Sequence, residues 1–170
     1  MRSTDSESLR IIDLWTFRSS KSNKRYIVEI EHFPRHFLGV KFYWKGVTDS
    51  KDRYSFLTMD YEPRKIVMSC IMIMLSYYQK NSNCSFGFVA SYSKNEIKDI
   101  NGLFPNKRFR FYRRMMLTLF SPEFFIQAID IKNSLYLLIN KKEFKKDSVS
   151  EISDQIEKIF SGNFNLNDIS

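Results

Sequence analysis

The residues most able to do chemistry are concentrated between positions 106 and 116. This stretch contains five cations and no acid, and three aromatic residues are interleaved with the cations. Arginine side chains bind phosphate groups through paired N–H donors, and aromatic rings stack on nucleic-acid bases. The pattern therefore predicts a surface that binds nucleic acid or an acidic protein. The cations are Lys107, Arg108, Arg110, Arg113 and Arg114, and the aromatic residues are Phe109, Phe111 and Tyr112.

A plain alternative is an amphipathic helix whose solvent-facing side happens to be basic, because charged outer faces are usual in globular proteins. Two further basic clusters bear on this choice, one between positions 18 and 25 and one between 141 and 146. If all three clusters lay on one side of the fold, the nucleic-acid interpretation would be favoured. The two clusters comprise Arg18, Lys21, Lys24 and Arg25, and Lys141, Lys142, Lys145 and Lys146.

A metal site has weaker support in the sequence. His32 and His36 lie close to Glu29 and Glu31, and all four side chains are of types that bind metals. Pro34 separates the two histidines, however, and prevents the helix that would place both imidazoles on one face. We therefore expect no metal site here, and no Ser or Cys nucleophile stands in a recognisable motif with a His and a carboxylate.

The composition is that of a packed globular protein, with 43% hydrophobic and 16% aromatic residues. A chain of 170 residues is long enough for one core, so we expect one domain over 1–170 with flexible ends at 1–8 and 165–170. The formal net charge of +8 favours an acidic or polyanionic partner. Only two cysteines are present, Cys70 and Cys84, which indicates reduced and buried thiols.

The first residues are polar and lack the apolar segment of a secretion signal. The longest apolar run, of about 10 residues, falls well short of the ~20 that a membrane-spanning helix needs. We therefore expect a cytoplasmic protein without a membrane partner. Whether it forms a homo-oligomer or a hetero-complex is left open.

The element that organises the fold is a helix predicted over 63–80. Every residue from Ile66 to Leu75 is apolar except Ser69, so other elements must cover this helix on most sides. Two acids precede the helix, and either Asp60 or Glu62 can cap its first turn.

Strand signals surround that helix. Runs of β-branched and aromatic residues predict an antiparallel meander of four strands before it and a strand after it that runs parallel to its predecessor. A second helix, a strand hairpin and a last helix from Ser148 follow. We therefore expect an α+β fold: a mixed, mostly antiparallel sheet with flanking helices. The predicted strands cover 9–18, 25–33, 38–45, 53–59, 84–90, 124–131 and 134–140.

The basic stretch falls on the second helix, which is predicted over 106–120. Its apolar residues recur at helical spacing and predict one buried face, with the cations Lys107, Arg110 and Arg114 on the opposite side. The predicted buried face comprises Phe109, Tyr112, Met116, Leu119 and Phe120.

This order of elements resembles the core of the GNAT acetyltransferase superfamily over residues 25–140. In that family the strand after the buried helix splays from its neighbour, and the next helix often carries an Asn and, about two turns on, a Tyr that serves as general acid. Asn106 and Tyr112 lie one residue short of that spacing. The resemblance implies acetyl-coenzyme A as cofactor, Tyr112 as general acid, and Arg64 and Asn106 beside the cofactor.

The chain departs from the family where that cofactor would bind. GNAT acetyltransferases hold the pyrophosphate on a loop of the form Gln/Arg-x-x-Gly-x-Gly/Ala at the N-terminus of the buried helix. The corresponding segment, 58–64, has no glycine, two carboxylates that repel phosphate, and a proline that removes one N–H donor. Arg64 offsets one negative charge. These differences argue against a normal acetyl-coenzyme A site.

Two functions follow from these patterns. The first is a non-catalytic, GNAT-like binding module without a cofactor, whose basic surface binds nucleic acid or an acidic protein. The alternative is an atypical acyl-coenzyme A-dependent N-acetyltransferase. Tyr112 lies on the predicted apolar face, where a core aromatic residue needs no catalytic role.

Overall fold

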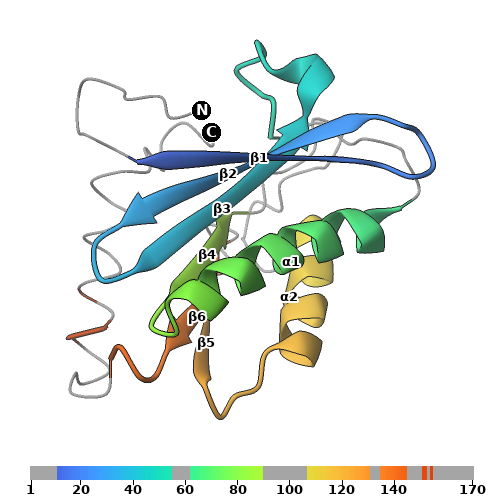
Figure 1. The fold of residues 1–170 in the computed structure, drawn as a ribbon. Coiled ribbons are helices and arrows are strands. Elements are labelled where there is room, and N and C mark those ends of the chain that lie inside the picture. Colours follow the sequence, from blue (N-terminus) through green and yellow to red (C-terminus); the bar gives the residue numbers. More distant parts are fainter. Residues whose placement is uncertain are drawn as a thin grey trace, which may run out of the picture.

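The computed structural model describes residues 11–54, 62–89, 107–130, 135–144, 151–152 and 154. Six strands form one mixed sheet in the order β1-β2-β3-β4-β6-β5, with two helices along one face (Figure 1). The predicted α+β class is therefore confirmed. The strands are β1 (Ile12–Arg18), β2 (Arg25–Phe33), β3 (Phe37–Trp44), β4 (Ser85–Val89), β5 (Phe125–Asp130) and β6 (Leu135–Asn140), and the helices are α1 (Pro63–Lys80), α2 (Lys107–Leu119) and the 3-10 turn η1 (Lys45–Val47).

The meander contains three strands in the described part of the chain, not the four that were predicted. β1, β2 and β3 pair antiparallel in sequence order. Arg53 and Tyr54, the start of the predicted fourth strand, lie in a turn, and 55–59 lie outside the described residues. The Tyr54 hydroxyl donates a hydrogen bond to Glu29 Oε2 at 2.5 Å, which draws this turn onto the sheet instead of extending it.

β4 follows α1 and runs parallel to β3, as predicted for a strand reached through a helical crossover. The β3–β4 pairing begins at Phe37 and Ser85 and ends at Val40 and Phe88, although β3 continues to Trp44. Beyond that point β4 keeps only its antiparallel partner β6. The two central parallel strands therefore share only a short ladder.

β3 ends one residue earlier than predicted, and Lys45 begins η1. The reason lies in Gly46, which packs under the indole ring of Trp44. A Cβ atom at position 46 would stand 2.4 Å from the ring, so only glycine lets the chain turn this closely.

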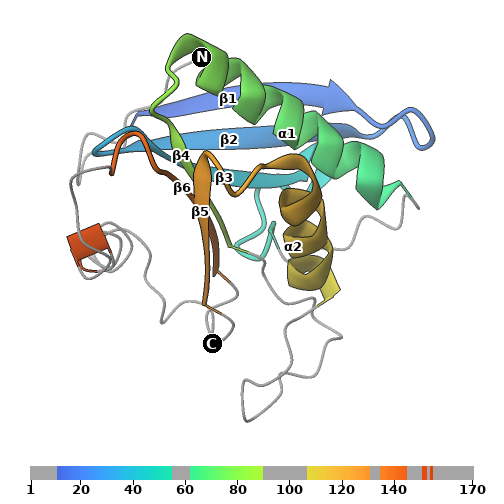
Figure 2. The ribbon, with the colours of Figure 1, turned by 90° about the horizontal axis from the view of Figure 1, so that it is seen from below.

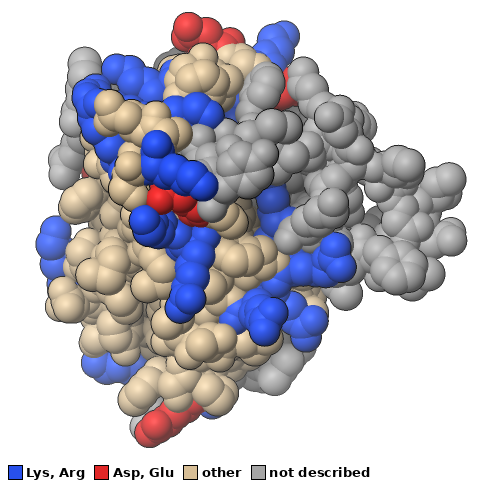
Figure 3. Space-filling view, turned by 90° about the vertical axis from the view of Figure 1, so that its right-hand side faces the viewer, with Lys and Arg blue, Asp and Glu red and all other residues tan. Residues whose placement is uncertain are grey.

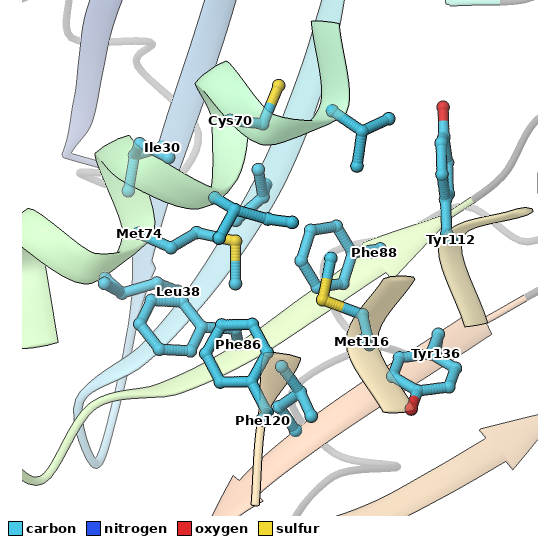
Figure 4. Close-up of a cluster of buried hydrophobic side chains, with 14 of the residues drawn as sticks. Ile30, Leu38, Cys70, Met74, Phe86, Phe88, Tyr112, Met116, Phe120 and Tyr136 are labelled. Atoms are coloured by element: carbon cyan, nitrogen blue, oxygen red, sulfur yellow. The ribbon is translucent and has the colours of Figure 1, made fainter. Parts of the chain in front are cut away.

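The main core lies between the sheet and the two helices. Figure 4 shows Cys70 and Met74 from α1, Met116 from α2 and Phe86 from β4 meeting over the sheet. Each is at most 2% exposed. Burying a large apolar side chain contributes about 1.5–3 kcal/mol, so this cluster accounts for much of the association of the helices with the sheet.

α1 has the predicted bounds but is covered on fewer sides than predicted. Met74 is fully buried, whereas Met72, two residues earlier, is 62% exposed. The sheet lies against only one face of α1, and the opposite face points to solvent (Figure 2). The buried residues of α1 are Ile66, Val67, Cys70, Ile71 and Met74.

A smaller core lies on the other face of the sheet. Alternate residues of β6 point to this side, where they pack with Phe144 and Ile152. Ile152 belongs to the last predicted helix, of which 151, 152 and 154 are helical and the remainder lies outside the described residues. The cluster comprises Phe33, Phe37, Leu135, Leu137, Ile139, Phe144 and Ile152.

β5 and β6 form the predicted antiparallel pair at one edge of the sheet. Both cysteines are free and buried, as predicted. Among the described residues, no helix combines the length and the apolar character needed to cross a membrane.

Candidate nucleic-acid interface

α2 is fixed to the fold by one apolar face. Phe109, Tyr112, Met116 and Phe120 are buried, which confirms four of the five positions predicted for that face. Leu119 is 45% exposed, so its predicted burial is wrong. Phe120, the next residue and also part of the predicted face, packs edge-on against Phe125 at a centroid distance of 5.5 Å.

Three arginines of α2 reach solvent: Arg110 and Arg114 lie opposite the buried face, and Arg113 lies on the flank of that face, four positions after Phe109. Arg110, Arg113 and Arg114 are exposed, and no ion pair joins them to an acid of the described residues. α2 contains no acidic residue that could neutralise them. Their guanidinium groups are therefore accessible to an external anion, and the buried face of the helix holds their backbone in place.

The other two cations of the predicted site differ from these three. Arg108 is half-buried, and its Nη1 donates a hydrogen bond to the carbonyl oxygen of Tyr54. Arg108 therefore connects the start of α2 to the turn over 51–54. The side chain of Lys107 and the whole of Asn106 lie outside the described residues.

The basic cluster at 18–25 forms the turn between β1 and β2. Arg18, Lys21 and Arg25 are exposed, and Lys24 Nζ lies 5.1 Å from the centre of the Trp44 ring, a cation–π distance. Asn23 has a positive φ of 57°, which this short polar residue tolerates, and the chain can therefore reverse here.

This turn and the start of α2 lie at the same end of the sheet. Trp44, the last residue of β3, pairs with Tyr26 just after the turn. The neighbouring Tyr43 packs against Tyr54 at 5.4 Å, and Tyr54 accepts the bond from Arg108. Figure 3 views this side of the molecule and shows Lys and Arg side chains gathered over the turn and the helices.

Glu62 connects the turn to α1. Its Oε2 accepts hydrogen bonds from Ser19 Oγ at 2.6 Å and from the Lys21 backbone N–H at 2.9 Å. Its Oε1 accepts from Ser20 Oγ and Lys65 Nζ at 2.9 and 3.0 Å. These donors, Ser19 and Lys65 foremost, lower the pKa of Glu62 from 4.5 to about 2.

Glu62 is the residue before α1, but its side chain does not cap the helix as predicted. The carboxylate turns toward the β1–β2 turn, where four donors satisfy it, and this geometry outweighs one bond to a helical N–H. Asp60, the other predicted cap, lies outside the described residues.

The third basic cluster lies elsewhere. Lys141 follows β6, and its backbone N–H donates to the carbonyl oxygen of Phe124, the residue before β5, while Lys142 Nζ donates to Ser82 Oγ. Ser82 precedes β4, and β4 begins beside Phe37, at the end of the sheet away from the β1–β2 turn. Lys141 and Lys142 are therefore separated from the other two basic clusters. In the described part of the chain, the three clusters do not all lie on one side of the fold.

Of the residues implied by an acetyltransferase, the structure describes Tyr112 and Arg64. Tyr112 is 9% exposed and packs against Phe42 at a centroid distance of 6.0 Å. Burial raises the pKa of Tyr112 well above its usual range, which makes the phenol a weak proton donor. Arg64 is exposed in the first turn of α1.

His32 and the two acids near Pro34 have separate partners, and His36 is exposed. His32 Nε2 lies 2.8 Å from Asp13 Oδ2, Glu29 accepts from Tyr54, and Glu31 forms a 2.7 Å ion pair with Lys41. Within the described residues, no three His, Cys, Asp or Glu side chains are grouped as a metal would need.

The Glu62 contact is the part of this surface that sequence patterns did not reveal. Ser19 and Glu62 are 43 positions apart, and neither belongs to a motif that would pair them. The serines of the 19–22 segment predicted a turn and gave no sign of its contact with Glu62.

No family model, curated protein or solved structure matches the chain.

Proposed function

We propose that this protein is a non-catalytic binding module, GNAT-like in the order of its elements, whose basic face binds nucleic acid. The observation that carries the proposal is that Arg110, Arg113 and Arg114 of α2 are all exposed without an acidic partner among the described residues. Arginines held in this way on a rigid element suit phosphate, because each guanidinium offers several donors in a fixed plane.

The sheet order supports the GNAT-like part of the proposal. The meander, the crossover helix α1 and the parallel strand β4 follow each other as in that family, and the terminal hairpin closes the same edge. The β3–β4 ladder also ends at Val40, in keeping with strands that separate. Fold order alone does not assign an activity, so the function rests on the surface chemistry.

The start of α1 supports a module without the family's cofactor. A carboxylate, Glu62, stands next to this helix N-terminus, and Pro63 removes one of the N–H groups that would bind a pyrophosphate. The cations Arg64 and Lys65 follow directly, but Lys65 is engaged with Glu62.

An acidic protein is the second partner that a basic face would suit, and salt dependence alone cannot separate it from nucleic acid. Fluorescence anisotropy with labelled DNA and RNA of mixed sequence, across a range of salt concentrations, tests nucleic acid directly. Binding that weakens steeply with salt is expected, because each phosphate contact releases counterions. An absence of binding to every nucleic acid at low salt would overturn the proposal.

The decisive variant replaces Arg110, Arg113 and Arg114 with Glu together. The slope of log affinity against log salt should flatten by about 2 to 3, since each phosphate contact contributes roughly 0.7 to 0.9. The control replaces Lys141 and Lys142, at the other end of the sheet, with Glu, and the double variant R110E/R114E carries the same charge change on α2. Equal losses in both variants would indicate a general charge effect and would count against a site on α2.

A further inference from the structure

The end of the molecule formed by the β1–β2 turn and the first turn of α1 is a second concentration of positive charge. We call it the basic end. Glu62 is the one acid in these two segments, and its carboxylate is already satisfied by four donors. The cations of the basic end are Arg18, Lys21, Lys24, Arg25, Arg64 and Lys65.

The sheet register places two of these cations directly opposite each other. Arg18 on β1 pairs with Arg25 on β2, so both side chains project from the same face at neighbouring positions. Like charges at directly opposed positions destabilise an antiparallel pair. A bound polyanion would relieve this repulsion, and the register therefore points to an anionic ligand at this end.

The turn also offers groups that suit phosphate in particular. Ser22 is an exposed hydroxyl residue between the cations, and its Oγ accepts the Lys24 backbone N–H, so its own hydrogen can be donated to a ligand; the Ser20 hydroxyl already donates to Glu62 Oε1. Hydroxyl groups, backbone N–H groups and Arg or Lys together make most protein contacts to nucleic-acid phosphates. An acidic peptide would need only the charges, so this mixture favours a phosphate backbone.

We infer that the basic end is a second phosphate-binding segment of the same nucleic-acid surface as α2, and that Glu62 is the positioning residue that holds it in place. This inference rests on the proposed function. Glu62 binds Ser19, Ser20 and Lys21 from one side and precedes α1 directly, so it fixes the turn relative to the helix. In this inference the Glu62 carboxylate does not contact the polyanion but holds in place the cations that do.

The phosphate-binding part is tested with the double variant R25Q/R64Q, because both arginines are exposed and no described acid pairs with them. Binding to a labelled duplex at about 0.1 M salt should fall roughly tenfold or more, and the salt slope should drop by nearly 2. The charge-matched control K141Q/K142Q should retain the wild-type slope. A wild-type slope in R25Q/R64Q would overturn the inference.

The positioning part is tested by a variant whose charge change alone predicts the opposite result. Glu62→Gln raises the net charge by one, which by itself strengthens binding to a polyanion. We expect a severalfold loss of affinity for the labelled duplex instead, because the β1–β2 turn is no longer held against α1. The control E123Q makes the same charge change at an exposed residue before β5 and should bind as tightly as the wild type or tighter. Equal binding of E62Q and E123Q would overturn the positioning role.

Ser19→Ala removes one of the four hydrogen bonds to Glu62, the 2.6 Å bond to Oε2, without a change in charge. It should show part of the affinity loss of E62Q, and the loss of the double variant S19A/E62Q should be smaller than the sum of the two single losses, because the variants share this contact. Additive losses would overturn the shared role. All variants are compared at a temperature where circular dichroism shows them folded.

The two proposals fail in distinguishable ways. If the wild-type protein binds no nucleic acid, the proposed function fails and this inference with it. If the wild type binds and the α2 triple variant is weakened, but R25Q/R64Q and E62Q bind as the wild type does, only the inference about the basic end fails.

Discussion

The Ser19 hydroxyl donates a 2.6 Å hydrogen bond to Glu62 Oε2 and so joins the end of β1 to the start of α1. Ser19 is buried, and its Oγ also accepts the backbone N–H of Ser22 within the turn. One hydroxyl therefore organises the turn and anchors it to the helix. The contact joins the three-strand meander to helix α1 across 43 positions, so local sequence patterns cannot predict it.

The first prediction concerns pH. The pKa of Glu62 is about 2 in the folded protein against 4.5 without these contacts, because the Ser19 hydroxyl and the Lys65 ammonium favour the charged form. A depressed pKa stabilises the fold above pH 4.5, and this contribution is lost as the pH falls toward 2. The urea midpoint of E62Q should therefore lie below that of the wild type at pH 7, and the difference should shrink between pH 4.5 and 2. A constant difference across this range would show that the carboxylate charge is not responsible.

The second prediction compares two methionines of α1. Met74 is fully buried among the core residues, and Met72 is 62% exposed. Met74→Ala should lower the free energy of unfolding by about 2–5 kcal/mol, because it removes apolar contacts and leaves a cavity. Met72→Ala, the same chemical change two residues away, should alter it by less than about 0.5 kcal/mol. Chemical denaturation of both variants measures the difference, and similar losses would contradict the one-sided burial of α1.

The periodic parts of the fold were predictable from sequence. α1 has its predicted bounds because its apolar run is longer than a typical strand, and Pro63 suits the first turn of a helix. The predicted fourth strand was wrong where the chain is described, since Arg53 and Tyr54 read as strand residues by type. Their tertiary contacts with Glu29 and Tyr43 override that preference.

The candidate site was predictable only in part. The exposure of Arg110 and Arg114 follows from helical spacing, because the buried Phe109 and Met116 fix which side faces solvent. Arg113 is four positions after Phe109 and three before Met116, so spacing alone does not predict its exposure. Arg108 has the same type and lies on the same helix, yet it bonds to the Tyr54 carbonyl, and spacing within one helix cannot reveal a partner on another segment. For the same reason, sequence spacing could not reveal that Glu62 bonds to the β1–β2 turn.

The third prediction concerns Asn140, the buried last residue of β6. Its Nδ2 donates to the carbonyl oxygens of Ser82 and Cys84 at 2.8 and 3.1 Å, and its Oδ1 accepts from the Lys142 N–H. Asn140→Leu should cost about 2–4 kcal/mol of unfolding free energy, since buried backbone groups lose their partners. Lys141→Leu, next to it and exposed, should cost less than about 0.5 kcal/mol. A neutral Asn140→Leu, measured by urea unfolding, would show that this network is dispensable.

The fourth prediction separates the binding module from an acetyltransferase. Tyr112 packs in the core, burial raises its pKa well above the usual range, and no hydrogen bond of its hydroxyl to a described residue is present. Tyr112→Phe keeps the ring, so stability should change by less than about 1 kcal/mol and nucleic-acid affinity should not change. An enzyme with Tyr112 as general acid would instead lose its acetyl transfer.

A thermal shift with acetyl-coenzyme A tests the same choice between a binding module and an acetyltransferase. A ligand present at 100 times its dissociation constant stabilises a protein by about 2.7 kcal/mol, which a thermal shift detects readily. Acetyl-coenzyme A should leave the melting temperature unchanged, because Glu62 and Pro63 occupy the place where a phosphate-binding loop would precede α1. A clear upward shift in the wild type, together with acetyl transfer that Tyr112→Phe abolishes, would replace the binding module with the atypical acetyltransferase.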